Sequence, residues 1–97
     1  MRIVRLLLHG RVQGVGFRYY VRGEAKVSGL EGWVRNRRDG SLEAVLAGDE
    51  RLIEGLINAC RRGPPESRVE KIDIEDADAA DLALRNPGEK FSMLGTA

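Results

Sequence analysis

Two segments with helical periodicity lie among five extended runs in this chain of 97 residues, and their order constrains the fold more than any other feature. Apolar side chains recur at helical spacing over residues 17–28 and again over residues 50–62. The extended runs are residues 3–8, 32–38, 41–47, 68–75 and the short stretch 91–93. The predicted order is therefore β-α-β-β-α-β followed by a short terminal strand.

This order is typical of the α+β class, as a ferredoxin-like α/β sandwich in which two helices cover one face of an antiparallel sheet. A helical crossover predicts that residues 32–38 run parallel to residues 3–8, with residues 41–47 inserted between them. Residues 3–8 are nearly all apolar, which predicts a central strand covered on both faces. We expect residues 36–38 to lie close to residues 10–18, although the two stretches are distant in the sequence.

Short-range signals mark where these helices and strands end. Gly29 follows the first helical segment as a left-handed cap residue, and Asp49 precedes the second one as an N-cap. The sequence Gly63-Pro64-Pro65 ends that second segment. The dipeptide Asp39-Gly40, between two extended runs, predicts a hairpin with a type I′ turn.

Length and composition indicate one globular domain over residues 1–97. Hydrophobic residues make up 42% and charged residues 32% of the chain, which is neither a disordered nor a fibrous balance. No apolar run approaches the ~18 residues of a membrane-spanning helix, and the N-terminal stretch does not fit a signal peptide. The single cysteine, Cys60, excludes an internal disulfide and a cysteine-based zinc site, which favours a reducing cytoplasm.

Charge is distributed unevenly along the chain. Residues 1–38 contain nine Lys or Arg against two acids, a balance of +7, and residues 39–97 contain seven against thirteen, a balance of −6. These two balances sum to the net charge of +1. A basic first third favours an anionic ligand in that region, although a solvated positive face balanced by an acidic one explains the same pattern.

A glycine-rich loop connects the first predicted strand to the first predicted helix. Residues 10–16 read GRVQGVG, and glycine allows backbone N–H groups to converge on one point. The start of a helix adds unpaired N–H groups and a partial positive charge, and Arg18 in its first turn can hold two oxygens of an anion. The loop is therefore a candidate anion site, with an ordinary glycine turn as the alternative.

A second motif, residues 32–36 (GWVRN), ends on a polar side chain beside this candidate anion site. The carboxamide of Asn36 can accept one hydrogen bond while it donates another, so it can orient a water molecule. The alternative is a purely structural role, in which Asn36 stabilises the hairpin.

Taken together, the two stretches resemble the acylphosphatase family. The first runs from Gly10 to Arg18, and the second comprises residues 32–36 followed by residues 39–43 (DGSLE), in the order and at the spacing of that family. The resemblance covers nearly the whole chain, through residues 63–64 to residues 91–93. It implies a small cytosolic, ferredoxin-like enzyme that hydrolyses acyl phosphates to a carboxylate and inorganic phosphate, without a metal or another cofactor.

The resemblance also implies roles for individual residues. Arg18 would bind the phosphoryl group and Asn36 would orient the attacking water, as the two catalytic residues. The backbone amides expected to cradle the phosphoryl oxygens belong to Arg11, Val12, Gln13, Gly14, Val15, Gly16, Phe17 and Arg18. The expected partners are a small acyl phosphate and its phosphate product, with neither nucleic acid nor membrane, and the expected state is a monomer.

Other candidate chemistry fits the sequence less well. Cys60 lies on the apolar face of a helix, and the Cys-x5-Arg phosphatase pattern fails because Glu66 stands at its last place. His9 has no acid nearby in the sequence to orient it, and the acidic residues between positions 73 and 81 are interpreted as a solvated face. A site built from Arg18, Asn36 and amides lacks a general acid, which suits a carboxylate leaving group with a conjugate-acid pKa of about 4.

Two alternative functions use the same fold. An RNA-recognition domain needs exposed aromatic side chains in a defined pattern on its sheet, and this chain has only five aromatic residues and no such stretch. The other alternative is a non-catalytic module that binds phosphate or carbamoyl phosphate, like the N-terminal domain of hydrogenase-maturation carbamoyltransferases. That domain belongs to much longer chains.

Overall fold

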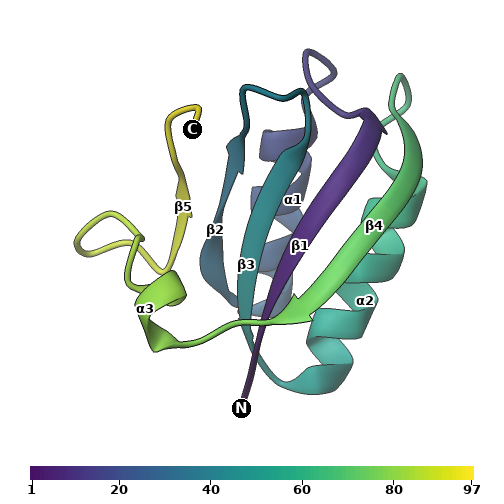
Figure 1. Ribbon diagram of the computed structural model, residues 1–97. Helices are drawn as coiled ribbons and strands as arrows, with labels where there is room; N and C mark the ends of the chain where they lie inside the picture. The colour runs from purple at the N-terminus through teal and green to yellow at the C-terminus, as the bar shows by residue number, and fades with distance from the viewer.

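A computed structural model describes residues 1–97 as a five-stranded sheet with two long helices on one face and a short helix against the other face (Figure 1). In chain order the elements are β1 (Arg2–Arg11), α1 (Phe17–Ser28), β2 (Glu31–Asn36), β3 (Leu42–Gly48), α2 (Glu50–Arg62), β4 (Arg68–Asp76), α3 (Ala79–Leu82) and β5 (Phe91–Met93). The predicted order of strands and long helices is confirmed, and α3 is an addition to it.

The strand order in the sheet is β4-β1-β3-β2-β5. Because β3 pairs antiparallel with both β1 and β2, these two strands run parallel with β3 between them, as predicted. β5 pairs parallel with β2, with Phe91 opposite Gly32, so the sheet is mixed and not wholly antiparallel as expected. The reason is visible in Figure 1, where the chain leaves β4 at one edge, crosses to the other edge through α3 and enters β5 in the direction of β2.

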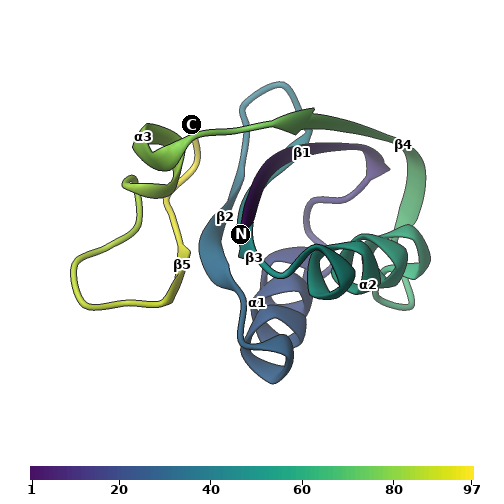
Figure 2. The ribbon, with the colours of Figure 1, turned by 90° about the horizontal axis from the view of Figure 1, so that it is seen from below.

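Burial along β1 alternates, because α1 and α2 cover only one face of the sheet (Figure 2). Val4, Leu6 and Leu8 are fully buried beneath the helices, whereas Arg5 and Leu7 are half-buried on the opposite side, which we call the open face. The expectation that this central strand is covered on both faces is therefore wrong. Its place between β3 and β4 is nevertheless central.

The helices α1 and α2 begin and end near their predicted caps. Gly29 has a φ of 71° in the left-handed region, and its N–H donates to carbonyls of the last turn of α1. The side chain of Asp49 accepts a hydrogen bond from the N–H of Arg51 at 2.8 Å, which satisfies one free donor of α2. At the other end of α2, the N–H of Gly63 donates to the carbonyl of Ala59.

The hairpin between β2 and β3 differs from the predicted type I′ turn. That turn needs a positive φ at Asp39, and no residue other than glycine has one. The N–H of Gly40 donates to the carbonyl of Arg37 at 3.1 Å, and the N–H of Arg37 donates to the carbonyl of Ser41 at 2.9 Å. The connection comprises residues 37–41, with Gly40 at φ 94°, so β2 ends at Asn36 instead of residue 38 and β3 begins at Leu42 instead of residue 41.

The acidic segment after β4, interpreted from the sequence as a solvated face, has local partners. Asp78 and Asp81 form a reciprocal capping box at the start of α3, and the carbonyl of Asp81 accepts a hydrogen bond from the indole N–H of Trp33 at 2.7 Å. This contact places α3 against the open face. No three His, Cys, Asp or Glu side chains converge as metal ligands, and none of the helices has the length and apolar character needed to cross a membrane.

Candidate active site

The loop after β1 and the end of β2 meet at one end of the sheet, where they enclose a small cavity of about 110 Å³. The cavity is lined by Val12, Gly14, Gly16, Phe17, Arg18, Tyr19 and Asn36. Figure 1 shows why these residues meet, because the loop before α1 and the β2–β3 hairpin leave the sheet at the same end. The predicted approach of residues 36–38 to residues 10–18 is therefore confirmed at Asn36.

The loop presents its backbone donors without internal partners. Gly14 and Gly16 have φ values of 72° and 79°, a conformation that other residues rarely adopt, and Gly16 is the N-cap of α1. None of the N–H groups of residues 12–16 donates to a carbonyl of the protein. The first N–H groups of α1 add further unpaired donors and the positive end of the helix dipole. This arrangement suits an anion.

Arg18 lies in the first turn of α1 and lines the cavity. Its side chain is half-buried, yet its guanidinium makes no hydrogen bond or ion pair within the protein. Arg35 and Arg37, by contrast, are committed to the carboxylate of Glu43. The donors of Arg18 are therefore available to a ligand in the cavity.

Asn36 is the last residue of β2 and also lines the cavity. Its side-chain oxygen Oδ1 is buried and has no hydrogen-bond partner within the protein, the only such buried side-chain atom in the structure. An unsatisfied buried acceptor costs about 1–3 kcal/mol, so such groups concentrate where a ligand or water completes them. Its backbone carbonyl accepts a hydrogen bond from the N–H of Ala97 at 3.0 Å.

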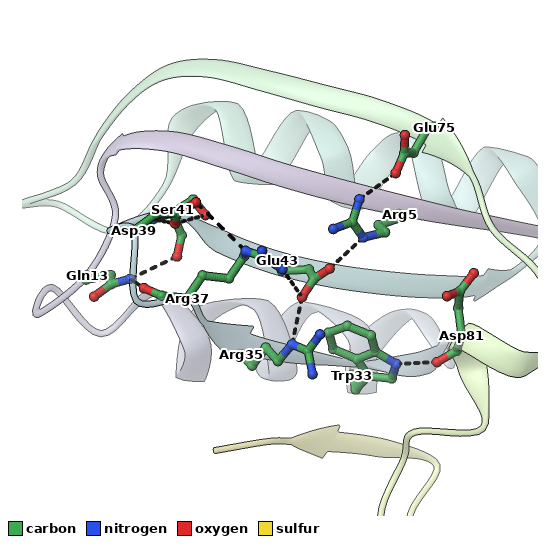
Figure 3. A network of polar contacts seen from close by, with 10 residues as sticks. All are labelled: Arg5, Gln13, Trp33, Arg35, Arg37, Asp39, Ser41, Glu43, Glu75 and Asp81. Carbon is green, nitrogen blue, oxygen red and sulfur yellow. Dashed lines mark hydrogen bonds and ion pairs between the residues drawn. The ribbon is translucent and has the colours of Figure 1, made fainter. Parts of the chain in front are cut away.

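Three residues of the predicted phosphate loop do not line the cavity. Arg11 is exposed at the end of β1, which extends three residues beyond its predicted end at position 8. Val15 packs against the main core instead. The side chain of Gln13 reaches the hairpin, where Nε2 donates to the carbonyls of Arg37 at 2.7 Å and Ser41 at 2.9 Å (Figure 3). Gln13 therefore holds the loop at a fixed distance from the end of β2.

Tyr19 lines the cavity, and sequence reasoning missed it. This residue is 62% exposed, and the guanidinium of Arg22 lies 5.4 Å from the centre of its ring. Its place directly after Arg18, in the first turn of a helix that opens on the loop, is the signal that could have identified it.

Other titratable candidates lie outside the cavity lining. His9 is paired at 3.0 Å with Asp73 of the neighbouring strand β4, so an orienting acid is near in space although none is near in the sequence. That bond and one from Lys71 hold the pKa of Asp73 below its ordinary value. Burial raises the pKa of the Cys60 thiol to about 12, so this thiol is neutral and unsuited to nucleophilic attack.

Comparison with known proteins agrees with the fold. The acylphosphatase family model matches residues 4–92. An acylphosphatase of Bradyrhizobium diazoefficiens is 53% identical over 94 residues, which make up 97% of this chain and 95% of that protein. The crystal structure of acylphosphatase from Bacillus subtilis matches with a TM-score of 0.84 and 37% identity, covering 97% of this chain and 99% of that chain.

A longer protein also contains this fold. The structure of full-length HypF in its phosphate- and nucleotide-bound form matches with a TM-score of 0.82 and 27% identity over 98% of this chain, but only 12% of that chain is covered. The curated relative, by contrast, is matched along nearly its whole length. On its match to the family model and to relatives along nearly its whole length, this chain belongs to the acylphosphatase family of enzymes.

Proposed function

We propose that this chain hydrolyses small acyl phosphates by in-line attack of a water molecule on a phosphoryl group held in the cavity. The observation that carries this proposal is the buried, unpartnered side-chain oxygen of Asn36, a residue that lines the same cavity as Arg18, whose guanidinium has no partner in the protein. Membership of the acylphosphatase family supports acyl phosphates as the substrate class. The products are a carboxylate and inorganic phosphate.

In this mechanism, Arg18 and the loop amides bind the phosphoryl oxygens. The guanidinium forms charge-assisted hydrogen bonds to two oxygens, and the N–H groups of residues 12–16, which have no carbonyl partner in the protein, reach the others. These donors are in place before substrate arrives, so the negative charge of the transition state is stabilised without reorganisation of the site. The side chain of Asn36 accepts a hydrogen bond from the attacking water and fixes its direction.

The lining of the cavity matches a leaving group that needs no proton. It contains no carboxylic acid, histidine or cysteine, the groups that most often protonate a leaving oxygen. A carboxylate departs unprotonated at neutral pH because its conjugate acid has a pKa of about 4. An alkoxide would require a general acid, so alkyl phosphate esters should be poor substrates. We propose that catalysis requires no metal ion and no organic cofactor.

We further propose that residues 1–97 function as one domain, as a monomer in the cytoplasm, without nucleic-acid or membrane partners. The second candidate function is a non-catalytic module that binds phosphate or carbamoyl phosphate. The similarity to a HypF whose structure is a phosphate- and nucleotide-bound form favours this candidate. The relatives that are matched along nearly their whole length favour the stand-alone enzyme.

The deciding experiment is phosphate release from benzoyl, acetyl and carbamoyl phosphate in the presence of EDTA, with glycerol phosphate as the matched ester. The enzyme should turn over at least one acyl phosphate and leave the ester intact. Binding of inorganic phosphate without turnover of any acyl phosphate would favour the binding module. Hydrolysis that stops in EDTA and returns with Mg²⁺ would contradict the metal-free mechanism.

A further inference from the structure

A buried carboxylate on the open face of the sheet gathers three arginines around it (Figure 3). The side chain of Glu43 on β3 is only 2% exposed. It accepts hydrogen bonds from Arg35 at 2.6 Å, from Arg37 at 3.3 Å and from Arg5 of β1. Arg5 also binds Glu75 of β4, which is 61% exposed, so the cluster spans four strands.

Glu43 is ionised in this setting. Burial on its own would raise the pKa of the carboxyl, but hydrogen bonds from Arg35 and Arg5 outweigh that effect and hold the pKa below its ordinary value. Buried ion clusters of this kind add little to stability compared with apolar residues of the same shape. A cluster that adds little stability can instead hold a neighbouring residue in a fixed position.

The residue beside it is Asn36. Arg35 and Arg37 precede and follow Asn36 in the chain, and both are tied to the same carboxylate. Successive side chains of a strand point to opposite faces, so the two arginines lie on the open face while Asn36 points to the cavity. The register agrees, because Arg35 pairs with Glu43 and Asn36 pairs with Leu42, which belongs to the core under the helices.

Both flanking residues are also held by second contacts. The guanidinium of Arg35 lies 4.6 Å from the ring centre of the buried Trp33, which gives this side chain a second contact besides Glu43. The carbonyl of Arg37 accepts the hydrogen bond from Gln13, which connects the cluster to the phosphate loop. Rotation of the peptide groups around Asn36 would therefore break several contacts at once.

We propose that Glu43 is a positioning residue, which sets the direction of the Asn36 side chain from the opposite face of the sheet by clamping Arg35 and Arg37. This inference rests on the proposed function, because it assigns Glu43 to the step in which Asn36 orients water. Glu43 itself touches no substrate, since it does not line the cavity. Its loss should therefore reduce turnover and leave phosphate binding at Arg18 and the loop in place.

The test compares Glu43→Gln with Glu75→Gln, which removes the exposed acid of the same cluster on a strand distant from Asn36. For each variant, kcat for benzoyl phosphate and the inhibition constant of inorganic phosphate are measured, with urea unfolding to establish that the protein is folded. Glu43→Gln should lower kcat about tenfold and change the phosphate constant less than about twofold. Glu75→Gln should change neither value more than about twofold.

Arg35→Gln removes the arginine partner of the ion pair between Arg35 and Glu43. This variant provides the test if Glu43→Gln does not fold. It should show the same fall in kcat with phosphate inhibition preserved. The inference is overturned if Glu43→Gln, or Arg35→Gln in its place, has the kcat of Glu75→Gln. It is equally overturned if kcat and phosphate binding weaken by the same factor. If the unmodified chain releases no phosphate from benzoyl phosphate, the proposed function fails and the inference falls with it, an outcome distinct from the others.

Discussion

Replacement of Arg18 by alanine should weaken ligand binding and catalysis while it leaves the stability of the fold nearly unchanged. The guanidinium has no partner within the protein, so no folded-state bond is lost. A positive charge in the first turn of a helix is mildly unfavourable, and alanine is the better helix former. These gains offset the packing lost from the half-buried side chain. The free energy of unfolding should therefore change by less than about 1 kcal/mol.

The effect on catalysis should be far larger. Two charge-assisted hydrogen bonds to phosphoryl oxygens contribute roughly 1.5–3 kcal/mol each, or about 3–6 kcal/mol together. At about 1.36 kcal/mol for each factor of ten, kcat/KM should fall by about 10²- to 10⁴-fold. Lysine at this position should restore little, because a point charge cannot hold two oxygens in the planar arrangement of a guanidinium.

The assay combines kcat/KM for benzoyl phosphate, inhibition by inorganic phosphate and urea unfolding. Arg22→Ala is the matched control, since Arg22 lies one turn later on α1 and does not line the cavity. Its kcat/KM should stay within about threefold of the unmodified protein. An Arg18→Ala protein with unchanged kcat/KM would refute the assignment of Arg18, and one that unfolds would refute the claim that this side chain has no structural partner.

Three further predictions concern Asn36, Cys60 and Glu43. Asn36→Ala should lower kcat about 10²-fold and keep phosphate inhibition better than Arg18→Ala does; unchanged kcat with weakened inhibition would contradict the water-orienting role. Iodoacetamide at pH 8 should not label native Cys60 or reduce activity, because burial raises the pKa of this thiol to about 12; rapid labelling of folded protein would contradict this. The pKa of Glu43 is lower in the folded than in the unfolded chain, so its stabilisation is present above the ordinary pKa of about 4.3 and is lost as the pH falls through the folded value. Urea unfolding at pH 7 and pH 3 should show a smaller acid-induced loss for Glu43→Gln than for the unmodified protein.

Much of the fold could be predicted because its signals are local. The helical spacing in α1 and α2 and the caps Gly29 and Asp49 depend on neighbouring residues only, and all of them are confirmed. The approach of Asn36 to the glycine loop followed from one topological rule, that a helical crossover returns the chain to the same end of the sheet. The family resemblance supplied the roles of Arg18 and Asn36, which remain predictions.

The features that could not be predicted depend on pairings across the sheet. The partner of His9 is Asp73, and the partners of Glu43 come from β1, β2 and the hairpin after β2, so no window of adjacent residues contains either set. The turn type was wrong because the side chain of Asp39 accepts hydrogen bonds from the N–H and hydroxyl of Ser41, which favours a longer loop. α3 had a signal, the capping pair Asp78 and Asp81, that its short length and acidic surroundings obscured.

The two proposed catalytic side chains are held by elements of different kinds, Arg18 by a helix and Asn36 by the end of a strand. The neighbouring residues on which their positions depend therefore differ. Arg18 is placed by a helix that begins on a left-handed glycine, so its position depends on the backbone of Gly16. Asn36 is at a strand end, where pairing weakens, and its direction depends on contacts from outside its own strand. Gln13 contacts the carbonyl of Arg37, and Glu43 binds the side chains of both Arg35 and Arg37. Arg37 is therefore the point at which the phosphate loop and the open face are coupled, although it does not line the cavity.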